Sequence, residues 1–245
     1  MAVRSVAVAI FCKTPAAGLS KTRLSPPLRP DECSALSACF IRDLAATIHG
    51  LSLDGDVAPY AVYTPTGTEP ALRALLSPSF NLLLQCEGDF GTRLHRATAD
   101  LLAAGHAGAI LVNADSPTLP ASILRAAVDA VREGNAVVLS PAIDGGYTLI
   151  GLSRPHARVF ADIPWSTPEV HRLTIERAAE IGVPVVNVPG WYDVDDTQTL
   201  RLLQAELAGE RPPFALRGTR GANAPATRHF LEQRLLQLQL AGAPW

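Results

Sequence analysis

The amino-acid sequence predicts an α/β protein whose mostly parallel sheet carries helices on both faces. Short apolar segments rich in β-branched residues alternate with longer segments whose apolar residues recur at helical spacing. This alternation favours parallel strand pairs, because a parallel connection needs a crossover segment that is usually a helix. The chain has 245 residues and a hydrophobic content of 48%, which is enough for a large core without disulfides or structural metals.

Seven segments are short, apolar and bounded by turn residues, as strands are. They are residues 3–12, 58–63, 81–85, 109–113, 136–140, 147–152 and 185–188. The first is the most apolar, and the turn residues after Thr14 end it. Ligands of such sheets bind at the carboxyl ends of the strands, so the loops that follow the strands are the candidate binding segments.

Seven further segments show helical spacing of their apolar residues. They are residues 31–49, 69–76, 91–104, 121–133, 168–181, 197–207 and 227–240. Asp31 is placed to cap the first helix, and Gly134 closes the fourth. The fifth has Thr167 as its cap, Pro168 at its first position and Gly182 at its end.

The amino-acid composition of the chain changes after residue 208. Residues 209–225 are rich in proline and glycine, which is typical of a linker, and residues 227–240 form one amphipathic helix. We therefore expect a domain over residues 1–208, followed at 209–245 by a linker and a helix that packs on the domain or on a partner. Packing on its own domain is favoured over a dimerisation arm, and a homodimer stays open.

Composition argues against several classes of function. A net charge of −2 without a basic run disfavours nucleic acid as a partner. Apolar runs such as residues 6–12 are far shorter than the ~20 residues that span a bilayer, and no signal-peptide pattern opens the chain. The four cysteines show no C-x-x-C spacing. A soluble cytoplasmic protein is the expectation.

The loop after the first strand is the strongest candidate for anion binding. The chain has 19 arginines but only two lysines, Lys13 and Lys21, and both lie in this loop with Arg23. Pro15 and Gly18 bend its backbone, and N–H groups in such a turn, together with cations, suit a diphosphate. The glycines of a P-loop are missing. Diphosphate binding is favoured over a merely solvated basic loop.

Three acidic segments follow other predicted strands. Asp115, after residues 109–113, is a turn residue or a divalent-cation ligand, and taken alone the turn is favoured. The turn that Asp144 opens is, on local grounds, a plain hairpin. The third segment holds Asp193, Asp195 and Asp196. Capping by Asp195 or Asp196 explains one of these acids, and a cation would relieve the repulsion among them.

The segments together resemble one family. F-x-K-x-P-x-x-G-x-x-K-T-R-L, Q-x-E-G-D-x-G-x-R-L, A-D-S-P-x-L, P-A-x-D-G-G-Y-x-L-I-G-L and D-V-D occur in this order over residues 6–203. They are similar to bacterial GT-A-type glycosyltransferases, and more narrowly to the group found beside arsenosugar-biosynthesis and radical-SAM selenodomain genes. The resemblance implies a three-layer Rossmann-like GT-A fold. More distantly, the chain is similar to molybdenum-cofactor and phospholactate nucleotidyltransferases.

The resemblance also implies roles for individual residues. The nucleotide and its diphosphate would bind Lys13, Pro15, Gly18, Lys21, Arg23 and Arg93. The donor sugar or acceptor would lie against Gly145, Gly146, Tyr147 and Trp165. Mg²⁺ or Mn²⁺ would be held by Asp115 with Asp193 or Asp195, between which the sequence does not choose. Asp144 is the candidate base. The chain departs from the family's usual pattern at residues 113–117 and 196–199, where later acids of the closing motif are missing.

The resemblance implies a metal-dependent transfer of a sugar from a nucleotide-diphosphate donor to a small-molecule acceptor. A nucleotidyltransferase that releases pyrophosphate is the alternative enzyme, since both kinds share the first loop and the metal-binding acid. A non-catalytic nucleotide-binding module is the third hypothesis. Neither H-E-x-x-H, G-x-S-x-G nor G-x-G-x-x-G occurs in the chain, so metalloprotease, serine-hydrolase and dinucleotide-binding functions lack support.

Overall fold

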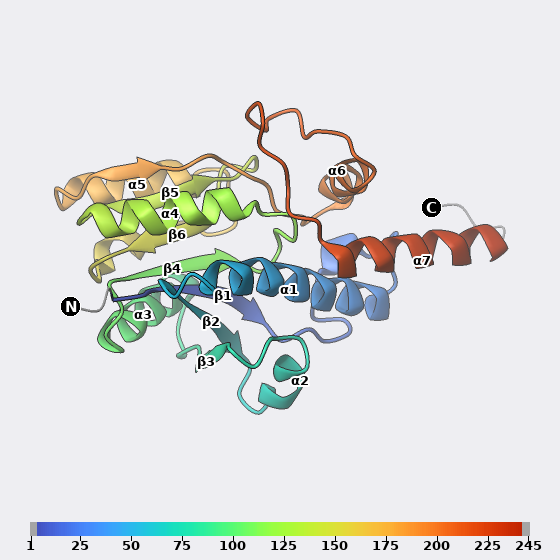
Figure 1. The fold of residues 1–245 in the computed structure, drawn as a ribbon, viewed down its shortest axis with the longest axis horizontal. Helices are drawn as coiled ribbons and strands as arrows, with labels where there is room; N and C mark the ends of the chain where they lie inside the picture. The colour runs from blue at the N-terminus through green and yellow to red at the C-terminus, as the bar shows by residue number, and fades with distance from the viewer. Residues whose placement is uncertain (1–3, 242–245) are drawn as a thin grey trace.

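The computed structural model describes residues 4–241, which form one seven-stranded sheet in the order β3-β2-β1-β4-β6-β5-β7 (Figure 1). The strands are β1 (Val6–Lys13), β2 (Val57–Thr64), β3 (Asn81–Leu84), β4 (Gly108–Asn113), β5 (Val137–Pro141), β6 (Tyr147–Leu152) and β7 (Val185–Asn187). All neighbours pair in parallel except β6, which is antiparallel to both β4 and β5. The predicted mostly parallel sheet is confirmed, although position 3 of the first predicted strand lies outside the described residues.

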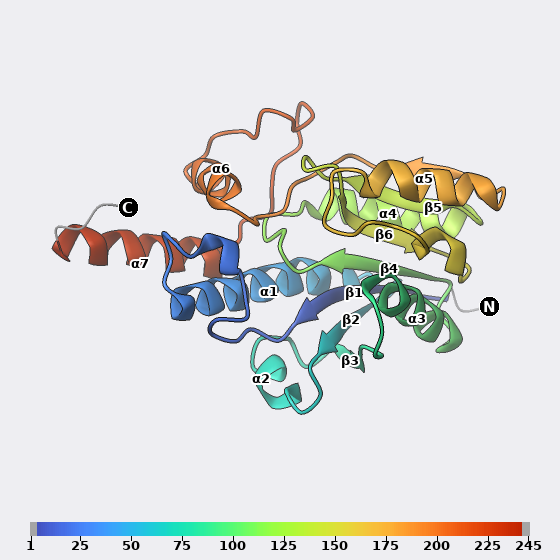
Figure 2. The ribbon, with the colours of Figure 1, turned by 180° about the vertical axis from the view of Figure 1, so that it is seen from behind.

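Helices cover the sheet on both faces. The helices of residues 4–241 are α1 (Pro30–Ser52), α2 (Glu69–Arg73), α3 (Phe90–Ala103), α4 (Ala121–Glu133), α5 (Val170–Glu180), α6 (Thr197–Leu207) and α7 (Pro225–Ala241), with two short 3₁₀ helices, η1 (Thr22–Leu24) and η2 (Ala157–Phe160). Helices α1 and α4 lie on one face and α3 and α5 on the other (Figures 1 and 2). The predicted α/β fold with three layers is therefore confirmed.

Alternation along β1, an interior strand of the sheet, explains the two cores. In β1, Val6, Val8 and Ile10 pack into the core beneath α1 and α4. Ala7 and Ala9 point to the opposite core, beside α3. All five side chains are fully buried, as expected for successive residues of a strand that is covered on both faces.

The start of α1 differs from the prediction. Arg29, not Asp31, occupies the N-cap, and Pro30 follows it at the first helical position. The Glu32 carboxylate accepts the Arg29 N–H at 2.7 Å, so the capping acid is one residue later than predicted. A proline at the first position has no N–H that needs a partner, which fixes where the helix begins.

The start of α5 also differs. The helix begins at Val170 with Glu169 at its N-cap, and no side chain caps it. The predicted cap, Thr167, instead donates its hydroxyl to Pro164 O at 2.7 Å. Here the local turn competes for the hydroxyl that a helix cap would use.

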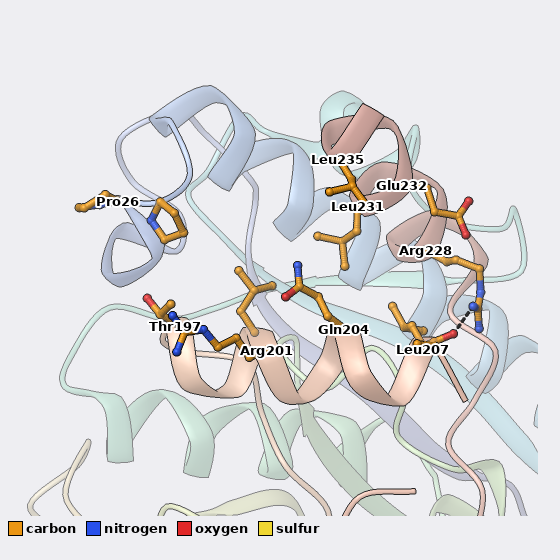
Figure 3. A pocket seen from close by; sticks show the side chains of 12 residues that line it. Pro26, Thr197, Arg201, Gln204, Leu207, Arg228, Leu231, Glu232 and Leu235 are labelled. Atoms are coloured by element: carbon orange, nitrogen blue, oxygen red, sulfur yellow. Dashed lines mark hydrogen bonds between the residues drawn. The ribbon is translucent and has the colours of Figure 1, made fainter. Parts of the chain in front are cut away.

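The last helix, α7, packs against α1 and extends beyond it, as both ribbon views show. A groove of about 660 Å³ lies between α6, α7 and the segment around Pro26 (Figure 3). Its lining is mostly aliphatic, with Leu200, Leu207 and Leu231 among its residues. Within residues 4–241 no helix is both long enough and apolar enough to cross a bilayer.

The strand order places a crevice at one edge of the sheet. From β1 the chain moves to β2 and β3 on one side, and then returns to β4 on the other side of β1. The connections after β1 and β4 therefore diverge at the carboxyl ends of these two parallel strands. Open α/β sheets bind their ligands at such a switch point.

Candidate functional site

A cavity of about 500 Å³ opens at the carboxyl ends of β1 and β4. Most of the residues that the sequence singled out line it: Lys13, Lys21, Arg23, Asp115, Asp144, Gly146, Tyr147, Trp165, Asp193 and Asp195. Four of them do not: Pro15, Gly18, Arg93 and Gly145. Segments up to 182 residues apart in sequence thus meet at one cavity, where three cations face four carboxylates.

Lys21 lies at the centre of these charges. Its Nζ is 2.8 Å from Asp115 Oδ1 and 2.8 Å from Asp195 Oδ1, and it donates to Val194 O at 2.6 Å. The Lys21 side chain is only 6% exposed, and its backbone adopts the left-handed conformation (φ 51°). That conformation is uncommon for a residue with a side chain, and here it belongs to the turn that begins η1, in which Leu24 N–H donates to Lys21 O at 2.9 Å.

The rest of the first loop is a compact turn that presents Lys21. Ser20 N donates to Ala16 O at 3.1 Å, and the Ser20 hydroxyl accepts Ala16 N–H at 3.1 Å. Gly18 takes a positive φ of 73° within this turn, which glycine adopts without steric cost. Gly18 and Pro15 lie outside the lining of the cavity and shape the loop.

The two partners of Lys21 differ in origin but share their surroundings. Asp115 follows β4, and its carbonyl accepts the Val194 N–H at 2.9 Å, which ties the two acidic segments together. Burial, together with the charge of Asp195, raises the pKa of Asp115 against the pull of Lys21. Burial lowers the pKa of Lys21, but Asp115 and Asp195 outweigh it and the pKa lies above its ordinary value. Lys21 is therefore charged at neutral pH.

Asp193 reaches the same cavity from the segment beside β5. Trp191 N donates to Pro141 O at 3.1 Å, which holds this segment at the end of β5. Burial, and then the charges of Asp195, Asp144 and Asp115, raise the pKa of Asp193 to about 7. A carboxyl group with such a pKa can bind or release a proton near neutrality.

Asp196 is the acid that caps α6. Its carboxylate accepts the Thr199 N–H at 2.8 Å, and it is the N-cap residue of the helix. Asp195, the other candidate cap, pairs with Lys21 instead. Adjacent acids thus have separate roles, since one stabilises a helix end and the other faces the cavity.

The Asp144 turn is both a hairpin and part of the cavity wall. Asp144 Oδ1 accepts the Gly146 N–H at 2.8 Å, as in other Asx turns between strands. Gly145 has φ 90°, and a Cβ there would lie 2.2 Å from Pro168 O. Only glycine fits this close approach to the segment before α5, which positions Asp144 and Tyr147 at the cavity.

Aromatic side chains form a wall that the sequence did not reveal as a group. Phe90 packs edge-on against Phe11 and Trp165, with ring centroids 5.6 and 5.0 Å apart, and all three line the cavity. Arg93 lies behind this wall, with its guanidinium 5.4 Å from the Phe90 ring and a 2.9 Å hydrogen bond to Gln85 Oε1. The sequence signal for Phe90 is its place in the same motif as Arg93.

A buried network supports the acidic segment from below, and sequence analysis missed it. Trp191 Nε1 donates to Thr118 Oγ1 at 3.1 Å, and Thr118 Oγ1 donates to Glu206 at 2.8 Å. Tyr192 also donates to Glu206. Trp191 and Tyr192 are among the most buried side chains. Their only sequence signal is their position directly before Asp193.

The donor set fits a hard divalent cation. Carboxylate oxygens are the ligands that Mg²⁺ and Mn²⁺ prefer. Burial and, after it, neighbouring negative charge raise the pKa values of Asp115 and Asp193, and a cation would relieve that repulsion. Among residues 4–241, however, no three His, Cys, Asp or Glu side chains converge as metal ligands. Lys21 Nζ lies between Asp115 and Asp195, so these carboxylates contact an ammonium group.

Comparison with protein families gives a match to part of the chain. Residues 47–167 match the model of a family described as "Uncharacterized protein conserved in bacteria (DUF2064)". This stretch carries Asp115, Asp144, Tyr147 and Trp165. No curated protein matches the chain.

Solved structures similar to this one include transferases of two kinds. A protein from Desulfovibrio desulfuricans G20, provisionally named a nucleotide-diphospho-sugar transferase, is 24% identical with a TM-score of 0.80, and the match covers 96% of this chain and 97% of that one. A cytidylyltransferase from Leptospira borgpetersenii serovar Hardjo-bovis (strain JB197) is 11% identical with a TM-score of 0.53, covering 96% of each chain.

A CMP:2-keto-3-deoxy-manno-octonic acid synthetase, solved with CTP, is 13% identical with a TM-score of 0.51. The match covers 84% of this chain and 100% of that one. The chain thus has the Rossmann-like fold of nucleotide-diphospho-sugar transferases and cytidylyltransferases. At these identities the likeness establishes the fold alone.

Proposed function

We propose that the protein is a metal-dependent glycosyltransferase that uses a nucleotide-diphosphate sugar and a small-molecule acceptor. One observation carries the proposal: Lys21, from the loop after β1, meets Asp115 and Asp195 at the switch point of the sheet. Cations that suit phosphate and carboxylates that suit Mg²⁺ or Mn²⁺ are the two requirements for holding a metal diphosphate.

The residues of the first loop would hold the diphosphate. Lys13, Lys21 and Arg23 line one side of the cavity, and their charges would stabilise the negative charge that develops on the leaving phosphates. Asp115 and Asp195, with Asp193 beside them, would hold the cation. When bound, Mg²⁺ or Mn²⁺ supplies further positive charge to a nucleoside-diphosphate leaving group.

The acceptor side of the cavity would be formed by the Asp144 turn and the aromatic wall. Tyr147, Trp165 and Phe90 offer apolar surface beside Asp144, which suits a ligand with apolar faces and a few polar groups. Asp144 is our candidate base for the acceptor hydroxyl. Asp193, whose pKa is about 7, is the second group at this cavity that could accept a proton.

A nucleotidyltransferase is the second candidate function. The fold shared with a cytidylyltransferase and with a synthetase solved in complex with CTP favours it. The same loop and carboxylates would then hold a nucleoside triphosphate, and pyrophosphate would leave.

The two functions differ in what they release. We would incubate the protein with Mn²⁺ and either UDP-, GDP-, ADP- and CDP-sugars or the four nucleoside triphosphates, with a panel of hydroxylated and phosphorylated acceptors. Release of nucleoside diphosphate supports glycosyl transfer, and pyrophosphate from a triphosphate contradicts it. Binding without turnover supports a non-catalytic module. Asp115→Asn should abolish turnover, whereas Asp129→Asn, on the exposed side of α4, should not.

The narrower resemblance to glycosyltransferases found beside arsenosugar-biosynthesis genes remains part of this proposal. We also propose a transferase domain at 1–208 with a C-terminal extension. The proposed location is cytoplasmic, and the proposed partners include neither nucleic acid nor a membrane. The low net charge of −2 supports the absence of nucleic acid as a partner, and the helix α7 packed against α1 supports an extension that packs on its own domain.

A further inference from the structure

The ammonium group of Lys21 has the surroundings of a bound cation. It contacts three oxygen atoms, one each from Asp115, Asp195 and Val194, at 2.6–2.8 Å. An ammonium group has three N–H donors, so these contacts use its full capacity. The side chain is 6% exposed, which leaves the group enclosed by its partners.

Two of these oxygens belong to the carboxylates that the proposed function gives to a divalent cation. Two positive charges bound to the same carboxylate oxygens repel each other strongly. A cation therefore cannot take these oxygens until Lys21 Nζ has moved away. The carboxylates themselves remain accessible, because the Asp115 and Asp195 side chains are 35% and 44% exposed and both line the cavity.

We propose that Lys21 is an internal cation that occupies the divalent-cation position of the ligand-free protein and leaves it when cation and diphosphate bind together. The inference rests on the proposed function, because it takes that site to bind both ligands. A diphosphate in the cavity gives the freed ammonium group a new anionic partner.

This exchange predicts that the two ligands bind cooperatively. A divalent cation alone must displace Lys21 into a cavity that offers it no diphosphate, so it binds weakly. A diphosphate alone must draw Lys21 from two carboxylates, which then repel the ligand. When both ligands are present, the diphosphate gives the displaced ammonium group a new partner and the cation neutralises the freed carboxylates. Each ligand therefore raises the affinity for the other by the same factor.

The first experiment measures Mn²⁺ alone, from the decrease of the free-ion signal in electron paramagnetic resonance. Lys21→Met should bind Mn²⁺ about tenfold more tightly than the unmodified chain, because it removes the competing charge from the carboxylates. Arg201→Met removes one positive charge from α6 outside this cavity and should leave the affinity within about twofold. Affinity of Lys21→Met equal to or below that of the unmodified chain would overturn the proposal.

The second experiment needs no substitution at Lys21. With only two lysines in the chain, ¹³Cε-lysine labelling gives two side-chain signals, and Lys13→Arg assigns them. Mg²⁺ with inorganic pyrophosphate should shift the Lys21 signal at concentrations where Mg²⁺ alone leaves it unchanged. A Lys21 signal that stays in place while calorimetry shows both ligands bound would contradict the exchange.

The outcomes separate this inference from the proposed function. Tighter Mn²⁺ binding by Lys21→Met in a protein that turns over no nucleotide sugar or triphosphate supports the exchange and contradicts the transferase. Turnover by the unmodified chain, without a gain in Mn²⁺ affinity for Lys21→Met, supports the transferase and contradicts the exchange.

Discussion

Two cations in this protein are equally buried and have opposite surroundings. The side chains of Lys21 and Arg234 are each 6% exposed. Arg234, on α7, pairs with Glu32 on α1 at 3.2 Å and donates to Pro27 O at 2.8 Å. Glu32 is 10% exposed, whereas the partners of Lys21 are 35% and 44% exposed.

The difference shows what burial of a charge does and does not imply. Glu32 also accepts the Arg29 N–H, so the Arg234 pair is fixed from both sides and joins α7 to the start of α1. The partners of Lys21 open onto a cavity, where another cation can reach them. An enclosed ion pair is structural, whereas a pair with accessible carboxylates can be exchanged.

The largest effect is expected from breaking the enclosed ion pair of Arg234 and Glu32. Arg234→Met leaves the buried Glu32 carboxylate with the exposed Arg29 guanidinium, 3.2 Å away, as its ion-pair partner, and removing one member of a buried pair costs up to about 3–5 kcal/mol of stability. Urea denaturation should show this loss, while kcat of the folded fraction stays unchanged. The double variant Arg234→Met/Glu32→Gln should recover most of the loss, because it leaves no uncompensated charge. A loss below about 1 kcal/mol for the single variant would place Arg234 with ordinary surface pairs.

The ion pair of Lys21 with its accessible carboxylates should show the reverse pattern, a loss of transfer rate rather than of stability. Lys21→Met should lower the rate of transfer by about 10²–10³-fold, the usual effect of removing one group that stabilises transition-state charge. Its stability in the presence of Mn²⁺ should approach that of the unmodified chain, since the cation replaces the lost ammonium group. Rates would be measured at saturating donor, and melting temperatures with and without Mn²⁺. An unchanged rate would remove Lys21 from the transfer site.

The next effect concerns the pH dependence that the burial of Asp193 and its neighbouring carboxylates cause. The pKa of Asp193 is raised to about 7 in the folded protein, so between about pH 4 and 7 the folded state binds a proton that the unfolded state has released. Stability contributed by this group therefore falls as the pH rises through that window. Asp195, Asp144 and Asp115 face it with like charge, and a hydrogen bond from its own backbone opposes them.

Asp193→Asn removes this dependence. Without divalent cations, the unmodified chain should lose on the order of 2 kcal/mol more than Asp193→Asn between pH 5 and 8. Urea midpoints at the two pH values measure the difference, and excess Mg²⁺ should abolish it. Equal pH profiles for both proteins would show that Asp193 does not feel the neighbouring acids.

Features with a local cause were predictable from the sequence. The bounds of α4 and α6 agree with those predicted, because apolar spacing and Gly134 or Asp196 mark their ends. The alternation of strands and helices placed Lys21 and Asp115 at the same edge of the sheet, since parallel strands end together. The predicted caps of α1 and α5 were wrong, because Pro30 fixes the first helical position of α1 and the Thr167 hydroxyl donates to Pro164 O instead of capping α5.

Features that depend on distant contacts could not be predicted. The pairing of Lys21 with Asp195 joins residues 174 positions apart, and the sequence left Asp193 and Asp195 undistinguished. The aromatic wall of Phe11, Phe90 and Trp165 comes from three separate segments. Local spacing gives the residue types of such a site, but only packing shows which of them touch.

The smallest expected effects distinguish the neighbouring acids Asp195 and Asp196. Asp196→Ala removes the N-cap of α6 and should cost about 1 kcal/mol of stability, the usual value for a lost cap, with little change in transfer rate or Mn²⁺ affinity. Asp195→Ala should weaken Mn²⁺ binding and slow transfer, because its carboxylate faces the cavity. Urea denaturation and Mn²⁺ titration of both variants test the division. This division of roles is contradicted if Asp196→Ala lowers Mn²⁺ affinity as much as Asp195→Ala does, since both acids would then belong to one cation site.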